Sequence, residues 1–312
     1  MSPRVACVGV FIVDVLGRPV EDLPRGQDSR LLDEIRITVA GTAGGTSVDL
    51  ARLGAEVVAV GAIGEDNLGD FMLGVLEEEG VATEHLARKP GVQTSATILP
   101  IHPNGNRPAW HVLGANATLE GDDMPWDELG SCDALHLGGL AALGALDGEP
   151  AARVARVARD AGVLTTADCL GVKRDDALEV VTPVLPYVDI FMPNEQEATA
   201  LTGEPDVAAA GRHLRTLGAT CVIVKRGEHG CLIVDEDGER DLPAFEAPVV
   251  DTTGCGDAFC AGVIVARCGG WSIDEAARLG NAAGALNLRG LGSDAGARSL
   301  DEAVEFMGSR VT

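Results

Sequence analysis

Short runs of Val, Ile and Ala alternate along the chain with longer stretches in which apolar residues recur every three or four positions. The short runs predict buried strands and the longer stretches predict amphipathic helices. Three predicted strands are each followed by a predicted helix, at residues 57–61 and 67–79, 134–137 and 150–160, and 188–192 and 194–201. A further strand is predicted at 163–168, and a helix at 207–217 precedes a strand at 220–224. This rhythm predicts an α/β fold: a doubly wound, mostly parallel sheet with helices on both faces.

The two ends of the chain extend the same pattern. A first apolar run covers residues 5–13, and a predicted helix at 46–53 follows two glycines. Predicted helices at 257–267, 273–287 and 300–309 close the fold. Because no repeat, low-complexity tract or linker interrupts the chain, residues 1–312 are predicted to form a single domain.

Two stretches depart from the βαβ rhythm, at about residues 15–39 and 94–113. In the second, apolar segments at 94–100 and 109–113 flank Pro-Asn-Gly-Asn at 103–106, and Asn-Gly is a strong hairpin turn signal. Strands that leave a parallel sheet and return often form a flap over its active edge. Both stretches are therefore predicted to hold the strands of a small β lid, with a plain surface hairpin as the alternative for the second.

The formal net charge is −24, from 48 acidic and 24 basic residues, and 46% of the 312 residues are hydrophobic, enough for a large core. Nucleic acids and anionic membranes need a cationic surface, so neither is an expected partner. The acidic surface favours solubility, with adaptation to a saline cytoplasm as the alternative. It repels phosphate groups at long range, so a phosphate-bearing ligand would need local hydrogen-bond donors.

Eight cysteines are scattered through apolar runs, without a CxxC pair or histidines at metal-site spacing. They are predicted to be buried free thiols. The sequence shows neither the pattern of a signal peptide nor an apolar run as long as a membrane span. The protein is therefore expected to be cytoplasmic and reduced.

Segment 251–262, Asp-Thr-Thr-Gly-Cys-Gly-Asp-Ala-Phe-Cys-Ala-Gly, combines a glycine-rich turn with a helix start. Gly254 and Gly256 let the backbone turn tightly and expose its N–H groups, and the following helix directs its positive end to the same place. An anion is expected there. Asp257 would lie beside that anion, where a carboxylate is useful if it accepts a proton or positions a nucleophile. The arrangement suits phosphoryl transfer.

Other polar residues follow predicted strands, at the edge where ligands of open α/β sheets gather. Asp14 follows the first apolar run, and Gly44 and Gly45 open the next helix. Together these residues suit a polyol held by charge-assisted hydrogen bonds, although Asp14 could instead cap a turn. Asn194 and Glu197 follow another strand, where a helix-capping box is the alternative.

The strand at 220–224 ends in a cationic group, Lys225-Arg226-Gly227, in a chain that has three lysines. A ligand contact and a solvated surface pair are both open interpretations. A dinucleotide-binding oxidoreductase would carry GxGxxG after the first strand, and residues 9–14 lack it because they read Gly-Val-Phe-Ile-Val-Asp.

Together, these motifs resemble the ribokinase-like, or phosphofructokinase-B type, carbohydrate kinase family. The resemblance spans nearly the whole chain, and segment 251–262 is its most specific part. The other matching segments are residues 9–14, Gly44-Gly45, 61–64 with Gly69, 114–116 and 193–197. The resemblance implies transfer of the γ-phosphoryl group of ATP to a hydroxyl group of a small sugar or nucleoside.

The resemblance also implies roles for individual residues. Asp257 would be the general base, and the N–H groups of Gly254, Cys255 and Gly256 would stabilise charge on the transferring phosphoryl group. The implied acceptor-binding residues are Asp14, Gly44, Gly45, Asp49 and Asn116. The implied nucleotide-binding residues are Asn194, Lys225, Gly227, Gly230 and Asn281. The implied metal-binding residues are Glu197, for Mg²⁺ through water together with Asn194, and Asp251, Thr253, Asn287, Gly290 and Gly292, for a monovalent cation such as K⁺.

The chain departs from the family pattern in three places. Where the family signature continues Gly-Gly-x-x-x-Asn, this chain has Asp49. An ionised carboxylate accepts hydrogen bonds but repels anions, so a neutral acceptor is predicted. Cys255 stands where Ala is frequent, and a thiol at a helix N-terminus is predicted to have a lowered pKa. Residues 15–39 have no clear counterpart, and acceptor specificity and dimer contacts usually lie there.

The leading prediction is an ATP- and Mg²⁺-dependent kinase that acts on the hydroxymethyl group of a neutral ribose- or ketohexose-like sugar. A nucleoside kinase of the same fold is the alternative. Trp110, His111 and Phe11 are candidates to stack on a base, although core packing also explains Phe11. A catalytically inert sugar-binding regulator is a third possibility. Exposed lid edges favour a homodimer paired through the lid.

Overall fold

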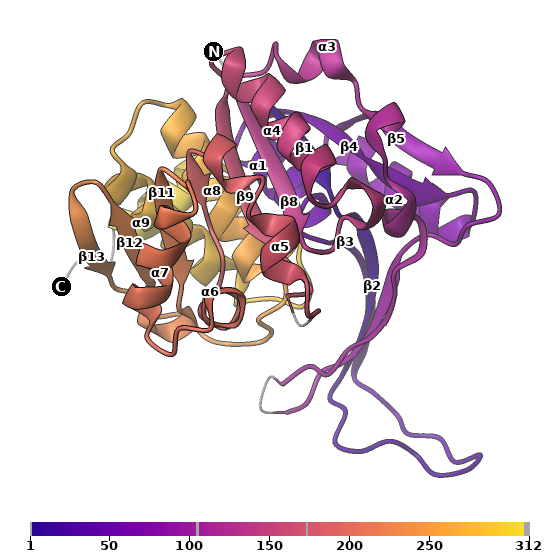
Figure 1. Cartoon of the computed structure of the whole chain (residues 1–312). Helices are drawn as coiled ribbons and strands as arrows, with labels where there is room; N and C mark the ends of the chain where they lie inside the picture. Colours follow the sequence, from indigo (N-terminus) through magenta and orange to yellow (C-terminus); the bar gives the residue numbers. More distant parts are fainter. Residues whose placement is uncertain (1, 104–105, 173, 309–312) are drawn as a thin grey trace.

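The computed structural model describes residues 2–103, 106–172 and 174–308, and a large sheet forms its centre (Figure 1). Within these residues the sheet has nine strands in the order β13-β12-β11-β10-β9-β8-β1-β4-β5. Pairing is parallel from β5 to β11, and β12 and β13 add an antiparallel edge. The strands are β1 Arg4–Gly9, β4 Glu56–Gly64, β5 Ala82–Lys89, β8 Ala134–Leu140, β9 Leu164–Cys169, β10 Ile190–Phe191, β11 Cys221–Lys225, β12 Cys231–Asp235 and β13 Gly238–Leu242.

Helices cover both faces of this sheet (Figure 1), and two clusters of buried side chains lie beneath them. In β1, Val5 and Cys7 belong to one cluster and Ala6 and Val8 to the other, because successive strand side chains point to opposite faces. The first cluster includes α1 Gly44–Arg52, α2 Asn67–Glu78, α8 Cys255–Cys268, α9 Ile273–Asn287 and α10 Leu300–Gly308. The second includes α3 Trp126–Leu129, α4 Glu149–Asp160, α5 Ala177–Val181, α6 Glu195–Thr202 and α7 Val207–Thr216. The predicted doubly wound fold is confirmed.

A second sheet, the lid, extends below the main body in Figure 1. Its strand order is β3-β2-β6-β7, and its strands come from the two stretches that depart from the βαβ rhythm. Strands β6 and β7 pair antiparallel, as expected of a hairpin, and residues 104–105 of the predicted Asn-Gly turn lie outside the described residues. The lid strands are β2 Ile12–Arg18, β3 Glu34–Ala40, β6 Ala96–Pro100 and β7 Trp110–Val112.

The apolar run at residues 5–13 is not one strand, which corrects the interpretation of Asp14. Strand β1 ends at Gly9, and the chain re-enters a strand at Ile12, in the lid. Gly9 permits this turn because its φ is +144° and a Cβ there would lie 2.0 Å from the Gly138 carbonyl oxygen. Asp14 therefore lies within lid strand β2, not at the end of a strand of the main sheet.

Three strands of the main sheet were not predicted. Strand β5 has the sequence Ala-Thr-Glu-His-Leu-Ala-Arg-Lys, and as an edge strand it buries too few side chains to show a strong apolar run. Strands β12 and β13 form an edge hairpin with Glu236 and Asp237 as its two-residue turn. The signal was available, because Asp237-Gly238 is a dipeptide typical of hairpin turns.

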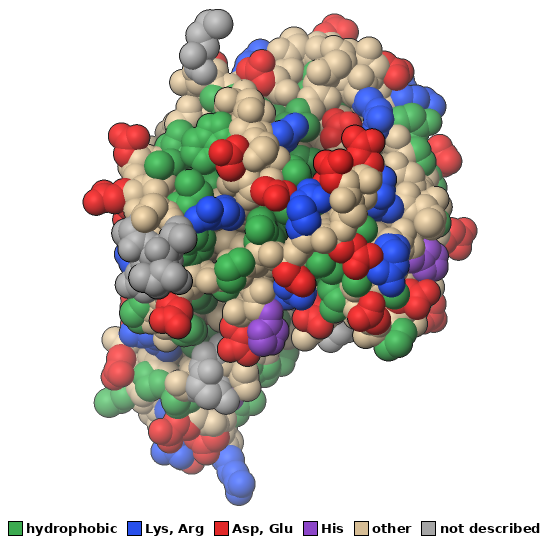
Figure 2. Space-filling view, turned by 90° about the vertical axis from the view of Figure 1, so that its left-hand side faces the viewer, with side chains coloured by type: hydrophobic (Ala, Val, Ile, Leu, Met, Phe, Trp, Pro, Cys, Tyr) green, Lys and Arg blue, Asp and Glu red, His purple; other side chains and the backbone are tan. Residues whose placement is uncertain are grey.

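All eight cysteines are unpaired, and six of them are buried, as predicted. Among the described helices, none combines the length and the apolar character needed to cross a membrane. On the face that Figure 2 shows, Lys and Arg side chains are interspersed with Asp and Glu.

Candidate active site

The topology places a ligand site at the carboxyl ends of β1 and β8. Strand β1 lies between β4 and β8, while the chain visits β4 and β5 before it returns to β8. Ligands of open α/β sheets bind at such a reversal. Helices α1 and α8 begin here, and a Cβ added to Gly45 in α1 would lie 2.5 Å from Oδ2 of Asp257 in α8. The structure thus brings together the predicted acceptor and catalytic residues.

The glycine-rich turn before α8 has the geometry of an anion site. Gly254 caps the helix in the left-handed conformation, with φ of +79°, and a Cβ there would lie 2.4 Å from Cα of Ser293. No other residue fits that space without displacing the backbone. The N–H groups of the first turn have no partner within the helix and carry its positive dipole end. Lys225 adds a cation, since its Nζ lies 3.4 Å from the place a Gly256 Cβ would take.

Asp257 has the electrostatic surroundings of a proton acceptor. Burial raises its pKa to about 8, the neighbouring charges of Asp168 and Asp14 act in the same direction, and Lys225 and Arg107 oppose them. A carboxylate whose pKa lies near the working pH is a stronger base than an ordinary aspartate. Asp257 therefore combines a position at the anion site with the basicity that abstraction of a hydroxyl proton requires.

Lys225 is a partner of buried acids, so its interpretation as a solvated surface residue is wrong. Although burial works the other way, Cys260 and the carboxylates of Asp168, Glu197 and Asp257 raise the pKa of Lys225. Its Nζ lies 3.8 Å from Sγ of Cys260. The lysine remains charged and partly neutralises the acids around it.

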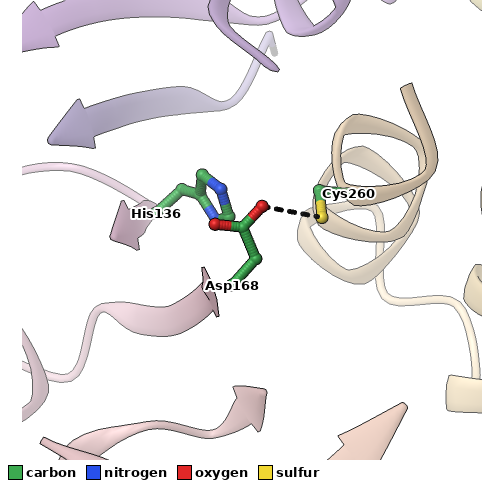
Figure 3. A group of neighbouring side chains, drawn as sticks. All are labelled: His136, Asp168 and Cys260. Atoms are coloured by element: carbon green, nitrogen blue, oxygen red, sulfur yellow. Dashed lines mark hydrogen bonds between the residues drawn. The ribbon is translucent and has the colours of Figure 1, made fainter. Parts of the chain in front are cut away.

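Asp168, at the end of β9, is a site residue that the sequence analysis missed. Burial raises its pKa to about 7, and Lys225 lowers it. Oδ1 accepts a hydrogen bond of 2.8 Å from the Gly139 N–H, and Oδ2 lies 4.0 Å from Sγ of Cys260 (Figure 3). The signal was present, because the predicted strand at 163–168 ends in this aspartate at the edge where Asn194 was found.

His136, Asp168 and Cys260 offer ligand atoms within 4.8 Å of one another, which is the spacing of a metal site (Figure 3). The positive charge of Lys225 beside Cys260 and Asp168 disfavours a divalent cation there. Burial lowers the pKa of His136 to about 3, so this imidazole is neutral, and its Nδ1 lies 3.0 Å from the Thr166 hydroxyl. The three residues are therefore interpreted as packed polar side chains next to Asp257 rather than as a metal site.

Asn194 and Glu197 form the capping box that the sequence left as the alternative. Oδ1 of Asn194 accepts the Glu197 N–H at 2.9 Å, and Oε2 of Glu197 accepts the Asn194 N–H at 2.8 Å. Asn194 also forms a parallel bridge with Lys225. Capping and a site role are compatible here, because the cap fixes both side chains beside the lysine.

The predicted cation residues form a hydrogen-bonded network behind the glycine turn. One Asp251 oxygen accepts the Thr253 N–H and hydroxyl, at 3.1 and 2.8 Å, and the other accepts the Gly292 N–H at 2.9 Å. Asn287 donates to the Thr253 carbonyl at 2.5 Å, while its own Oδ1 is buried without a partner. Gly290 lies next to this group, with its N–H 3.5 Å from the Asn287 carbonyl.

The acceptor side contains a row of polar residues across the lid. Thr38 and Thr97 pair with Asp14 from the two neighbouring strands, and all three are buried. Burial raises the pKa of Asp14 to about 6, while a hydrogen bond from Thr97 lowers it. The side-chain amide of Asn116 donates to the Phe11 carbonyl at 2.9 Å and accepts the Phe11 N–H at 3.2 Å. These bonds fix the start of β2 and thereby position Asp14.

The pKa values of two residues are shifted against the expectation from the sequence. Burial and the charge of Asp257 raise the pKa of Asp49 well above its ordinary value, which disfavours the ionised form expected from the sequence. The prediction of a neutral acceptor therefore no longer rests on this residue. Burial also raises the pKa of the Cys255 thiol to about 12, against the predicted lowering. In both residues, loss of contact with water outweighs the local effect inferred from the sequence.

The other predicted nucleotide residues lie beyond β11, which ends at Lys225. Gly227 lies in the exposed turn after the strand. Gly230 has φ of +79°, and a Cβ there would lie 2.0 Å from the Leu242 carbonyl oxygen, so close packing of the hairpin explains this glycine. Asn281, in α9, donates to the Pro243 carbonyl at 3.1 Å. None of these three residues contacts Asp257 through a described hydrogen bond.

A cavity of about 520 Å³ lies at the opposite edge of the sheet, where β9 begins. Its lining includes Asp133, Arg159, Asp189 and Arg267, and none of the predicted site residues. These side chains balance their charges, and ligands of such sheets bind at the other edge. The cavity is therefore not the candidate active site.

Comparisons with known proteins agree with this geometry. The model of the pfkB family carbohydrate kinases matches residues 2–299. An uncharacterized sugar kinase from Archaeoglobus fulgidus is 33% identical over 258 residues, which cover 81% of this chain and 99% of that protein. Two solved structures show the same ribokinase-like fold. Arabidopsis thaliana ribokinase complexed with ribose and ATP has a TM-score of 0.82 and 23% identity, and the match covers 99% of this chain and 100% of that one. An Escherichia coli protein in complex with ATP and Mg²⁺ has a TM-score of 0.85 and 21% identity, and the match covers 99% of this chain and 100% of that one. The chain belongs to the pfkB family of carbohydrate kinases and is a sugar kinase.

Proposed function

We propose that this sugar kinase transfers the γ-phosphoryl group of ATP to a hydroxymethyl group of a neutral ribose-like or ketohexose-like sugar, with residues 1–312 acting as one catalytic domain. The observation that carries the proposal is the position of Asp257, against Gly45 on the acceptor side and in the first turn of α8 on the phosphate side. The ribose and ATP bound to the Arabidopsis neighbour support this substrate class.

In the proposed reaction, the acceptor hydroxyl gives its proton to the Asp257 carboxylate. The hydroxyl oxygen forms a bond to the γ-phosphorus, and the bond from that phosphorus to the bridging oxygen breaks, so that ADP leaves with the electron pair. The N–H groups of Gly254, Cys255 and Gly256 and the ammonium of Lys225 stabilise negative charge on the transferring group. Gly45 leaves room beside the Asp257 carboxylate, because a Cβ there would lie 2.5 Å from Oδ2 of Asp257.

Unsatisfied buried polar atoms support a polyhydroxy acceptor. Thr38 Oγ1, Thr46 Oγ1, Asp49 Oδ2 and Ser293 Oγ are buried without a partner in the described structure. Such atoms are costly unless a ligand or water satisfies them. Thr38 pairs with Asp14, Thr46 follows Gly45, and Ser293 lies against Gly254, so these atoms surround the junction of the two half-sites.

The lid supports a sugar over a nucleoside. Phe11 is fully buried in the core, and Trp110 pairs with Ile98 on the lid face opposite Asp14. Of the three candidates for stacking, His111 alone pairs with Thr97 in the row of Asp14. A base would therefore lack an aromatic platform from the other two.

Acceptor-dependent ADP release over a panel of pentoses, ketohexoses, nucleosides and sugar phosphates tests this proposal. The expected result is highest kcat/KM with a neutral sugar. Best turnover with a phosphorylated or carboxylated sugar would contradict a neutral acceptor, and no ADP release with any acceptor would support the inert regulator.

Mg²⁺ fits the residues next to Lys225. The side-chain oxygens of Asn194 and Glu197 are held by the capping box at the start of α6, and oxygen ligands, often through water, suit this ion. When bound, Mg²⁺ would neutralise charge on the ATP phosphates.

A monovalent cation fits the network behind the anion site. The unpartnered Oδ1 of Asn287 and the carboxylate of Asp251 are oxygen donors in a buried position. A bound cation would order the glycine turn through Thr253 and Gly292. We expect kcat to be several-fold higher in K⁺ than in a bulky organic cation at equal ionic strength, and Asp251→Asn to remove the difference. Equal rates in both salts would exclude the cation site.

The raised pKa of Asp257 predicts the pH dependence. Asp257 accepts a proton only when ionised, so kcat/KM should fall as the pH decreases below about 8, by about tenfold per unit. Asp168, with a pKa of about 7, broadens the lower part of this limb. A profile that stays flat down to the ordinary pKa of an aspartate would contradict the assignment.

We propose a homodimer that pairs through the lid. The lid face opposite Asp14 exposes Ile35 by 68%, Ile98 by 56% and Trp110 by 51%, which is unusual for such large apolar side chains. Sedimentation should show a dimer for the wild type and a monomer for Ile98→Glu. Leu31→Glu is the control, since Leu31 is exposed in the lid but outside its strands. A wild-type monomer at micromolar concentration would contradict lid pairing.

A cytoplasmic location is part of the same proposal. All eight cysteines are unpaired, and free thiols persist in reducing compartments. The acceptor and the nucleotide are both small cytoplasmic molecules in this scheme.

A further inference from the structure

Four polar side chains form one row across the lid, on the face that carries Asp14. Asp14 of β2 pairs with Thr38 of β3 and with Thr97 of β6. Thr97 in turn pairs with His111 of β7. Residues that pair across neighbouring strands point to the same face of a sheet, so all four side chains share this face. His111 is the outermost member of the row, because β7 is an edge strand of the lid.

The row leads away from the site of phosphoryl transfer. Asp14 is close enough to Asp257 for its charge to raise the pKa of that carboxyl, in addition to burial and the charge of Asp168. His111 lies two strands away from Asp14, which is about 10 Å at the usual spacing of neighbouring strands. The row therefore extends from the reacting hydroxyl group toward the far end of a bound sugar.

A chain of hydrogen bonds fixes the imidazole of His111. Its Nδ1 lies 3.0 Å from Oγ1 of Thr97. Although burial raises the pKa of Asp14, the hydrogen bond that Thr97 donates to it lowers that pKa. The single hydroxyl proton of Thr97 is thus used on Asp14, so the Thr97 oxygen accepts the second bond and Nδ1 of His111 carries the proton.

The other ring nitrogen of His111 is an acceptor that a ligand can reach. Partial burial lowers the pKa of His111, so the imidazole is neutral at neutral pH and Nε2 bears a lone pair. In the part of the chain that the structure describes, Nε2 forms no hydrogen bond, and the residue is exposed. A hydroxyl group complements such an atom because it donates a proton, whereas an ionised carboxylate or phosphate brings acceptors only.

We propose that His111 is a specificity-determining residue whose Nε2 accepts a hydrogen bond from a hydroxyl group at the end of the sugar remote from the phosphorylated hydroxymethyl group. The inference rests on the proposed function and deepens it, since it states which part of the acceptor the lid recognises. Asp14 and Thr97 are positioning residues in this respect, because they determine which nitrogen of His111 carries the proton. Sugars that lack the remote hydroxyl are then poor acceptors, although their reacting group is intact.

Acceptor kinetics with deoxy analogues of the best sugar, each lacking one hydroxyl group, test the inference. For the wild type, kcat/KM should be about tenfold lower with the analogue that lacks the remote hydroxyl, as expected for the loss of one hydrogen bond. His111→Asn reaches only the position of Nδ1, so it keeps the bond to Thr97, loses the ligand contact and should lose this discrimination. His111→Gln reaches the position of Nε2 and should recover part of it.

Val112→Asn is the matched control, because Val112 is the next residue of β7 and faces the other side of the lid. It should discriminate as the wild type does, and thermal melting verifies that all variants fold. The inference is overturned if His111→Asn discriminates as strongly as the wild type, or if it lowers kcat/KM equally for the sugar and every analogue. Failure of the proposed function is distinct, because the wild type would then phosphorylate no neutral sugar, and that result overturns the inference as well.

Nitrogen NMR of the imidazole gives a readout besides activity. The resonances of His111 are assigned by their absence from His111→Asn. In the free protein they should show a protonated Nδ1 and an unprotonated Nε2, and the Nε2 resonance should move when the sugar binds. A protonated Nε2 in the free protein, or an Nε2 resonance that stays in place at saturating sugar, would contradict the proposed contact.

Discussion

Asp257→Asn is expected to lower kcat by about 10²- to 10⁴-fold. Asparagine keeps the size and the hydrogen-bonding reach of the side chain but cannot accept the acceptor proton. KM for ATP and acceptor should change little, because the glycine turn, Lys225 and Asp14 remain. The measurement is steady-state ADP release with the best acceptor from the panel.

The control for this variant is Asp70→Asn, which removes an exposed carboxylate on α2 that pairs with Arg88. It should retain wild-type kcat. An Asp257→Asn enzyme as active as Asp70→Asn would exclude Asp257 as the base. Equal, near-zero activity of wild type and Asp257→Asn with every acceptor would instead support a protein without catalysis.

Asp257→Asn should also raise Tm, which separates a catalytic role from a structural one. The folded-state pKa of Asp257 is raised to about 8 by burial and by the charges of Asp168 and Asp14. An acid with a raised pKa destabilises the fold when ionised, and protonation removes that cost as the pH falls. The gain in Tm should therefore be larger above pH 8 than below it. A loss of Tm would indicate that the carboxylate holds the fold together.

Lys225→Met is expected to have the second large effect, lowering kcat by about 10²- to 10³-fold. The lysine supplies positive charge beside Gly256 and lowers the pKa values of Asp257 and Asp168. Without it, Asp257 should titrate at a higher pH, so the acidic limb of kcat/KM should move upward. The pH–rate profile distinguishes this effect from simple loss of phosphate binding.

Lys225→Met should lower Tm, in contrast to Asp257→Asn, because it leaves Asp168, Glu197 and Asp257 without their shared cation. Lys89→Met is the matched control, since Lys89 lies at the end of the outermost strand β5 and forms an ion pair of 2.7 Å with Asp123. The control should keep wild-type kcat and its pH profile. A Lys225→Met enzyme with an unchanged acidic limb would contradict the proposed coupling to Asp257.

The sequence by itself determined the features that depend on neighbouring residues. The alternation of apolar runs predicted the parallel strands and their covering helices, because each element must bury one face. Segment 251–262 predicted an anion site, since two glycines and a helix start are a local arrangement of backbone donors. Asn194 and Glu197 predicted a helix cap for the same reason. The edge strands β5 and β13 escaped this reasoning because edge strands bury fewer side chains, whereas the buried strand β12 was missed although its sequence is apolar.

Only the tertiary structure decided the charges and partners within the site. Asp14 lies in the lid because the chain turns between Gly9 and Ile12. Lys225 interacts with Asp168 and Glu197 because β9, β11 and α6 meet at one edge of the sheet. The pKa values of Asp49 and Cys255 are raised, against the expectation from the sequence, because burial, which depends on distant segments, outweighs local effects. The physical reason is the same throughout: ionisation and charge pairing depend on neighbours in space, whereas strands, caps and glycine turns depend on neighbours in the chain.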